Sequence, residues 1–111
     1  MTVTTLRFNQ VATGLDRRDL AARYQATVEM AAYADTRGVD LISLEEHHGA
    51  HDGWSPSPLI TAGAIFGATR TVRVMLCAII TPLHDPLRPA EDLAVLDHLG
   101  DGRLTVVAGI G

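Results

Sequence analysis

Six ionisable side chains follow a short apolar run near the middle of the chain. The run Val39–Leu44 is apolar and partly β-branched, which predicts a buried strand. The ionisable residues come directly after it: Glu45, Glu46, His47, His48, His51 and Asp52. Catalytic and binding side chains of α/β proteins gather at the carboxyl ends of such strands. We therefore take this stretch as the candidate functional site.

His47 is a candidate general acid or base, because histidine changes its charge near neutral pH. The alternative is a loop histidine that only satisfies backbone groups. Successive residues of an extended chain face opposite sides, so His48 would point away from His47, and we interpret it as structural. For the same reason Glu45 and Glu46 are not expected to form an acid–base pair.

A metal site is the main alternative for this stretch. Imidazole and carboxylate ligands are available from His47, His48, His51, Asp52, His84 and Asp85. However, the adjacent His47 and His48 cannot readily bind one ion in strand geometry. Neither H-x-H nor H-E-x-x-H spacing occurs. We therefore predict no metal.

Cys77 is the only cysteine, which excludes an intrachain disulfide and favours a reducing cytoplasm. It lies within the apolar run Val74–Ile80, where burial would leave its thiol unreactive. That run is far shorter than the roughly 20 residues that span a bilayer. The N-terminus lacks the pattern of a signal peptide. We expect a soluble, cytoplasmic protein.

Composition and charge narrow the class of protein further. The 111 residues are 47% hydrophobic and 20% charged, which is typical of a globular protein with room for one core. The net charge of −4 and the scattered basic residues predict neither nucleic acid nor an anionic membrane as a partner.

The hydrophobic periodicity predicts strands that alternate with helices. Strands are expected at Val3–Val11, Val39–Leu44, Val72–Ile80 and Leu104–Ala108, and helices at Leu20–Arg37, Pro58–Thr69 and Asp85–Leu99. Asp19, Ser57 and Asp85 are the expected N-caps, and Gly38 the expected C-terminal glycine of the first helix. This order predicts a parallel sheet, either a small doubly wound sheet or the first half of a (β/α)8 barrel. A complete barrel needs roughly 250 residues, and a chain that stops on a strand favours a truncated barrel.

Two packing expectations follow from the same pattern. The strand Val72–Ile80 is apolar on both faces, which predicts that both faces are covered. The third helix should bury a stripe made of Leu87, Ala90, Ala94 or Val95, and Leu99.

Several of these segments carry a family resemblance in order along the chain. They are the EHH of Glu46–His48, SPSPLITAGAIFGATRTVRV at Ser55–Val74, HDPLRPAEDLAVLDHLGDGRL at His84–Leu104, and a glycine-ended fourth strand. From about Arg7 to Gly111, the sequence resembles the bacterial luciferase-like family of flavin-dependent monooxygenases, whose relatives include enzymes that use the deazaflavin F420. EHH alone would be weak, but the ordered series is specific.

The resemblance implies the N-terminal half of a TIM barrel with a flavin over the carboxyl ends of its strands. In that family, the flavin rests against a non-prolyl cis peptide, and the aligned pair here is Cys77–Ala78. The histidine that assists the oxygen chemistry aligns with His47. Glu46 is the better carboxylate to approach the flavin, and we expect Glu45 to form a salt bridge at the barrel rim.

One pair of positions departs from the luciferase proper. That enzyme carries a reactive cysteine and then an arginine after the fourth strand, where this chain has Gly109 and Ile110. The departure weakens the case for a light-emitting luciferase and leaves the wider family open.

The resemblance therefore predicts residues 1–111 to be a partial luciferase-like domain of a monooxygenase. It would use reduced FMN, supplied by a flavin reductase, and oxygen on a small organic substrate. One alternative is an F420-dependent reductase or dehydrogenase, and another is a non-catalytic flavin-binding half-barrel. The outer strands would have unpaired edges, so we expect a homo-oligomer.

Overall fold

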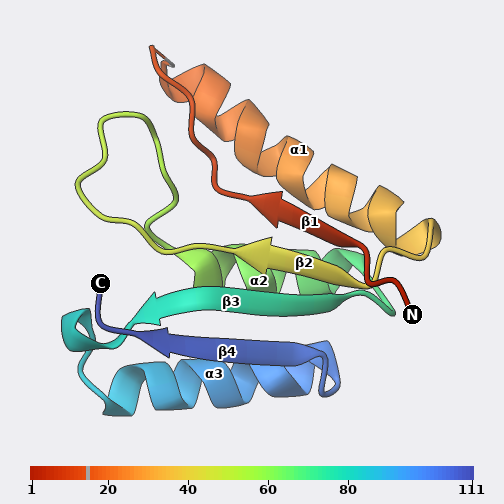
Figure 1. Cartoon of the computed structure of the whole chain (residues 1–111). Coiled ribbons are helices and arrows are strands. Elements are labelled where there is room, and N and C mark those ends of the chain that lie inside the picture. The colour runs from red at the N-terminus through yellow and green to blue at the C-terminus, as the bar shows by residue number, and fades with distance from the viewer. Residues whose placement is uncertain (15) are drawn as a thin grey trace.

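A computed structural model describes residues 1–14 and 16–111, in which strands and helices alternate (Figure 1). The elements are β1 (Thr5–Phe8), α1 (Arg17–Thr36), β2 (Leu41–Leu44), α2 (Pro58–Ala68), β3 (Arg73–Ile80), a short 3₁₀ turn η1 (Thr81–Leu83), α3 (Leu87–Gly100) and β4 (Leu104–Gly109). Every predicted helix and strand is present in the predicted order. No helix within the described ranges is long and apolar enough to cross a membrane.

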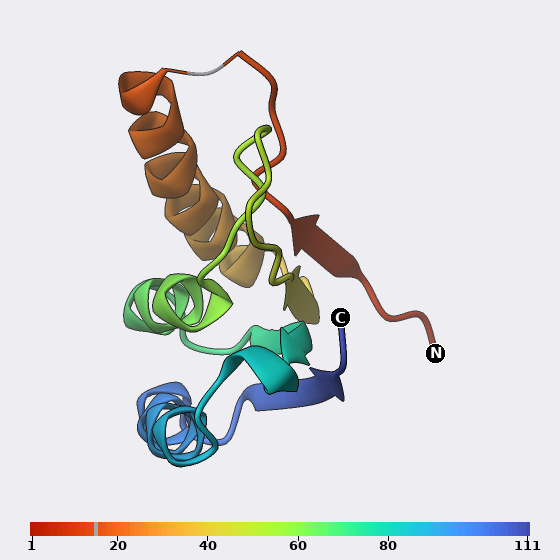
Figure 2. The same ribbon diagram turned by 90° about the vertical axis from the view of Figure 1, so that its left-hand side faces the viewer.

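The strands of the described residues form one parallel sheet in the order β1-β2-β3-β4. The α-helices described all lie on one face of it, as the rotated view shows (Figure 2). A doubly wound sheet would reverse its strand order and carry helices on both faces. The arrangement is instead that of parallel βα units from one half of a (β/α)8 barrel, so the predicted fold class is confirmed. The face without helices is called the open face below.

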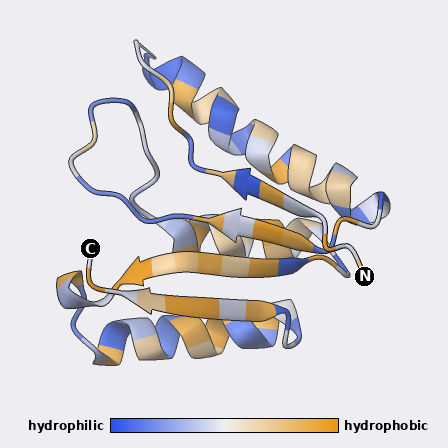
Figure 3. Cartoon of the chain, in the orientation of Figure 1, coloured by the Kyte–Doolittle hydropathy of each residue, from blue (hydrophilic) through white to orange (hydrophobic). Residues whose placement is uncertain are grey.

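The core lies between the sheet and its helix layer. Hydrophobic side chains recur along β2, β3 and β4 (Figure 3). The buried core residues are Ala31, Ile42, Leu44, Ala62, Ile65, Phe66, Val72, Val74, Leu76, Ile79 and Leu96. A Cβ on Gly100 would meet the Phe66 ring at 2.8 Å, so the last residue of α3 must be small for α3 to approach α2. From the side of α2, a Cβ on Gly63 would lie 3.5 Å from Leu96 Cδ2, which is ordinary contact distance.

The helix ends differ in detail from the prediction. Asp16, rather than Asp19, caps α1, and its side chain accepts a hydrogen bond from the Asp19 N–H. Helix α1 therefore begins three residues earlier than predicted. Ser57 precedes α2 without a side-chain cap hydrogen bond. Gly38 has the predicted left-handed conformation, with φ of 74°.

Two packing predictions are wrong for the described residues. Only one face of β3 is covered, so Cys77 is exposed on the open face rather than buried. The expected stripe of α3 faces away from the core, and Leu87 is 67% exposed. Helix α3 instead buries Leu96 and Gly100, which share the neighbouring side of the helix. Both errors arose because apolar residues were assumed to be covered.

Asp35 fastens the end of α1 to the loop that leads into β3. Its carboxylate accepts hydrogen bonds from the backbone N–H groups of Arg70, Thr71 and Val72 at 2.6–2.9 Å, and from the Thr71 hydroxyl at 2.6 Å. Burial opposes ionisation, but these hydrogen bonds outweigh it and hold the pKa of Asp35 well below its usual value. The charged form therefore stabilises the amino-terminal side of the sheet.

The variant Asp35→Asn is expected to lower the free energy of unfolding by about 1 kcal/mol, because the site is partly exposed to solvent. Urea denaturation at pH 7 measures this change, with the exposed Glu91→Gln as a control that should stay near zero. The depressed pKa means that the contribution is complete above the unfolded-state pKa and is lost as pH falls toward the folded-state pKa. A wild-type chain no more acid-sensitive than Asp35→Asn would contradict this role.

Candidate functional site

Alternation along β2 divides the site into two clusters on opposite sides of the sheet. Ile42 and Leu44 point into the core, so Glu46 continues toward the helix layer while Glu45 points to the open face. The open-face cluster is Arg7, Glu45, His47 and Trp54, and the helix-face cluster is Glu46, His48 and His84. The predicted separation of the neighbouring pairs is confirmed.

In the open-face cluster, Glu45 is the central residue. It forms an ion pair with Arg7, which confirms the predicted salt bridge, and this pairing raises the pKa of Arg7. The Trp54 indole N–H donates to Glu45 Oε2 at 2.9 Å. The His47 ring stacks on Trp54 with its centroid 3.6 Å away and its plane inclined by 27°. His47 Nε2 lies 3.9 Å from Glu45 Oε2.

The loop after β2 holds these side chains through its backbone. The His47 N–H donates to the Ser55 carbonyl at 2.9 Å, and the Ser55 N–H donates to the Asn9 carbonyl at 3.1 Å. The Trp54 N–H donates to Asp52 Oδ1 at 3.3 Å, which helps to shape the turn. Residues beyond the ends of β1 and β2 are thereby fixed beside each other. His47 remains reachable, with 44% of its side chain exposed.

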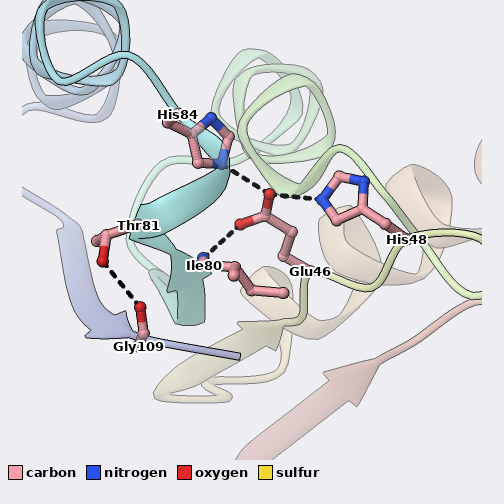
Figure 4. Close-up of polar contacts among 6 residues, drawn as sticks. All are labelled: Glu46, His48, Ile80, Thr81, His84 and Gly109. Atoms are coloured by element: carbon pink, nitrogen blue, oxygen red, sulfur yellow. Dashed lines mark hydrogen bonds and ion pairs between the residues drawn. The ribbon is translucent and has the colours of Figure 1, made fainter.

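In the helix-face cluster, the Glu46 carboxylate is fully enclosed, with 0% of its side chain exposed. Figure 4 shows its polar contacts. The Ile80 N–H donates to Oε2 at 2.7 Å, while Nε2 of His48 and Nε2 of His84 lie 2.8 Å and 2.7 Å from Oε1. Burial alone would raise the pKa of Glu46, but these hydrogen bonds outweigh it and lower the pKa. That Glu46 contacts a flavin directly stays a prediction.

The Cys77–Ala78 peptide bond is cis, as the resemblance implied. The pairing of β3 with β4 shifts by one residue between Cys77 and Ile79, so Ile79 rather than Ala78 returns to the core. Cys77 lies exposed on the open face, the side of the sheet that carries Arg7 and Glu45. That this segment supports a flavin stays a prediction.

The residues of the metal hypothesis are not gathered around one point. In the part of the chain that the structure describes, no group of three or more His, Cys, Asp or Glu side chains could hold a metal ion. His51 is exposed, Asp52 accepts from the Trp54 N–H, and Asp85 accepts from the Leu87 N–H at 3.1 Å. His84 Nε2 lies 2.7 Å from Glu46 Oε1.

Sequence reasoning missed the contribution of Arg7 and Trp54. Arg7 interrupts an apolar alternation between Leu6 and Phe8, which marks it as an open-face residue of β1. Trp54 is the only tryptophan and lies in the site loop, and that was a signal available from the sequence. Together they compensate the Glu45 charge and fix the His47 ring. The cluster thus offers a proton-transfer group, a fixed cation and an aromatic surface.

Comparisons with known proteins match the sequence and the fold of this chain to other proteins. The model of the luciferase-like monooxygenase family matches residues 1–111. The alkanal monooxygenase alpha chain of Photorhabdus laumondii subsp. laumondii is 33% identical over 76 residues, which are 68% of this chain and 21% of that one.

Two solved structures share the fold. A Baeyer–Villiger monooxygenase, the oxygenating constituent of 3,6-diketocamphane monooxygenase from Pseudomonas putida in complex with FMN, has a TM-score of 0.88 at 23% identity and covers 98% of this chain. Monooxygenase RslO1 from Streptomyces bottropensis has a TM-score of 0.88 at 27% identity and covers 97%. The chain spans 30% and 33% of these two structures. It thus corresponds to a third or less of the relatives' length.

The stacking of Trp54 on His47 makes the lone tryptophan a reporter of the histidine. A ring stacked on the indole shields it from water, so His47→Gln is expected to change the intensity and the emission maximum of Trp54 fluorescence at constant pH. The exposed His51→Gln serves as the control and should leave the emission unchanged. An emission spectrum of His47→Gln that equals the wild-type spectrum would contradict the stacked arrangement.

Proposed function

The chain belongs to the luciferase-like monooxygenase family, and on this premise we propose that it forms part of the flavin site of an oxidoreductase. The enzyme would use reduced FMN and molecular oxygen to oxidise a small organic substrate. A flavin reductase would supply the reduced cofactor, and the protein would act in the cytoplasm as a homo-oligomer.

The observation that carries this proposal is the open-face cluster beside Cys77 and Ala78. His47 is half-exposed there, held by Trp54, and lies at the same side of the sheet as the exposed Cys77. A planar ring system needs an open surface with few charged side chains pointing at it. Here the Glu45 charge is compensated by Arg7 and the Trp54 N–H, so the surface fits an aromatic cofactor.

Each residue then has a distinct part. The backbone of Cys77 and Ala78 would support the isoalloxazine, and His47 would give or take a proton at the reacting substrate or cofactor atom. Glu45 holds the Trp54 indole, and the stacked indole orients His47. When bound, the reduced flavin supplies the electrons with which oxygen is activated.

FMN is preferred over F420 in this proposal. The similar Pseudomonas putida structure is in complex with FMN, and relatives with more than 30% identity include alkanal monooxygenase alpha chains. An F420-dependent reductase of the same fold is the second candidate. Parallel titrations with FMN and F420 distinguish the two, since the tighter ligand identifies the cofactor class.

Cys77 offers a direct test of where the flavin binds. As the only cysteine, and exposed, it should react with a thiol-alkylating reagent in the free chain. Bound FMN should slow this reaction about tenfold when free FMN is about ten times its Kd, because only the unbound chain reacts. The alkylation rate, followed by mass spectrometry, measures the protection.

AMP is the matched control, because it carries ribose and phosphate without the isoalloxazine ring. It should leave the alkylation rate of Cys77 unchanged. Saturable FMN binding without protection of Cys77 would place the flavin elsewhere, and an absence of FMN binding would refute the proposal for this chain.

The role of His47 is tested by turnover. His47→Ala is expected to reduce oxygen-dependent turnover of the protein with reduced FMN by roughly 10²–10⁴-fold, as the loss of a general acid or base does. Its FMN affinity should change little, because the proposed function of His47 is proton transfer. His51→Gln is the control from the same loop. Unchanged turnover in His47→Ala would exclude this role.

A further inference from the structure

We propose that Glu46 is a positioning residue for the flavin site, holding the carboxyl end of β3 against the segment that carries His47. This inference rests on the proposed function for its meaning and assigns Glu46 a part other than direct contact with the cofactor. It concerns the helix-face cluster, behind the sheet as seen from the open face.

The geometry shows one carboxylate joining two stretches of the chain, residues 46–48 and residues 80–84, that lie more than thirty positions apart. Glu46 follows β2 directly, the Ile80 N–H belongs to the last residue of β3, and His84 follows η1. The remaining partner, His48, belongs to the loop after β2 (Figure 4). Glu46 is adjacent to His47, and Ile80 is two residues from Ala78, so the carboxylate connects the two parts of the proposed flavin site.

The charge makes this connection strong. Hydrogen bonds to an ionised acceptor are about twice as strong as neutral ones. An enclosed carboxylate without partners would be costly, so Glu46 is retained in this position only with its donors in place. The low pKa of Glu46 agrees with an ionised form that is well satisfied by these donors.

A second hydrogen bond extends the connection to β4. Thr81 directly follows Ile80, the residue whose N–H donates to Glu46. The Thr81 hydroxyl donates to the Gly109 carbonyl at 2.9 Å (Figure 4). A Cβ on Gly109 would lie 3.0 Å from the Ala78 Cβ, so β4 also packs tightly on the segment in question. Ala78 therefore lies between the carboxyl end of β3, which Glu46 holds, and Gly109 of β4.

The test compares two single variants of this protein, Glu46→Gln and Asp35→Asn. Both substitutions remove a carboxylate that accepts several hydrogen bonds. Asp35, however, joins α1 to the loop before β3, at the amino-terminal ends of the strands, whereas Glu46 lies at their carboxyl ends. Both variants should be destabilised in urea. Only Glu46→Gln should weaken FMN binding, by roughly tenfold, as the loss of a hydrogen bond to a charged group does.

A readout without flavin accompanies this comparison. In amide NMR spectra, Glu46→Gln should shift the signals of Ala78, Ile80 and His47 and accelerate hydrogen exchange at Ile80. Asp35→Asn should instead perturb the amides of residues 70–72. If Glu46→Gln fails to fold, His84→Gln takes its place, because it removes one partner and leaves the carboxylate charged. Its expected effect has the same direction and is smaller.

The outcomes separate the two proposals. Weaker FMN binding together with shifted amides, in Glu46→Gln alone, supports the positioning role. Equal losses of FMN affinity in Glu46→Gln and Asp35→Asn, or an FMN affinity within about twofold of wild type in Glu46→Gln, overturns it. If the wild-type chain binds no FMN, the proposed function fails. The amide signals then decide the positioning role: shifts at Ala78 and His47 support it, and unchanged signals overturn it.

Discussion

A helix layer on one face of the sheet is the constraint on which the rest of the structure depends. Because the helices need apolar partners, every second residue of β2, and of β3 as far as Leu76, points toward them and is buried. The residues between are left to the open face, where polar groups can face solvent or a ligand. This division continues past the end of β2 and sends the neighbours Glu45 and Glu46 in opposite directions. The two adjacent carboxylates thereby have different environments and different partners.

The order of elements could be predicted from sequence because it depends on local signals. Periodicity marked each helix and strand, Gly38 marked the end of α1, and alternation separated His47 from His48. What could not be predicted is which apolar surface is covered. An exposed Leu87 and a buried Leu96 have the same side chain, and only the position of α2 distinguishes them. The packing of one element against another cannot be predicted from a local sequence pattern.

The contacts that the site residues make with distant residues also could not be predicted from the sequence. The sequence indicated that the carboxylates would diverge and that Glu45 would form a salt bridge, but not that Arg7 would be its partner. His84 was named only as a candidate ligand of a metal site that was not predicted, and its contact with Glu46 was not foreseen. These contacts join residues more than thirty positions apart, and they follow from the parallel register of the strands. Long-range pairing of this kind becomes visible only once the sheet is built.

The register shift between β3 and β4 has a consequence for how this segment can vary. The extra residue between Cys77 and Ile79 inverts the alternation, so that Ile79 is buried and Ile80 presents its N–H to Glu46. If the stretch kept its length but paired without this shift, strict alternation from Leu76 would bring Ala78 into the core and turn Ile79 to the open face. The Ile80 N–H would then no longer meet the carboxylate. A deletion of one residue would instead restore regular pairing and keep Ile79 inside, at the expense of one of the two residues, Cys77 and Ala78, that precede it.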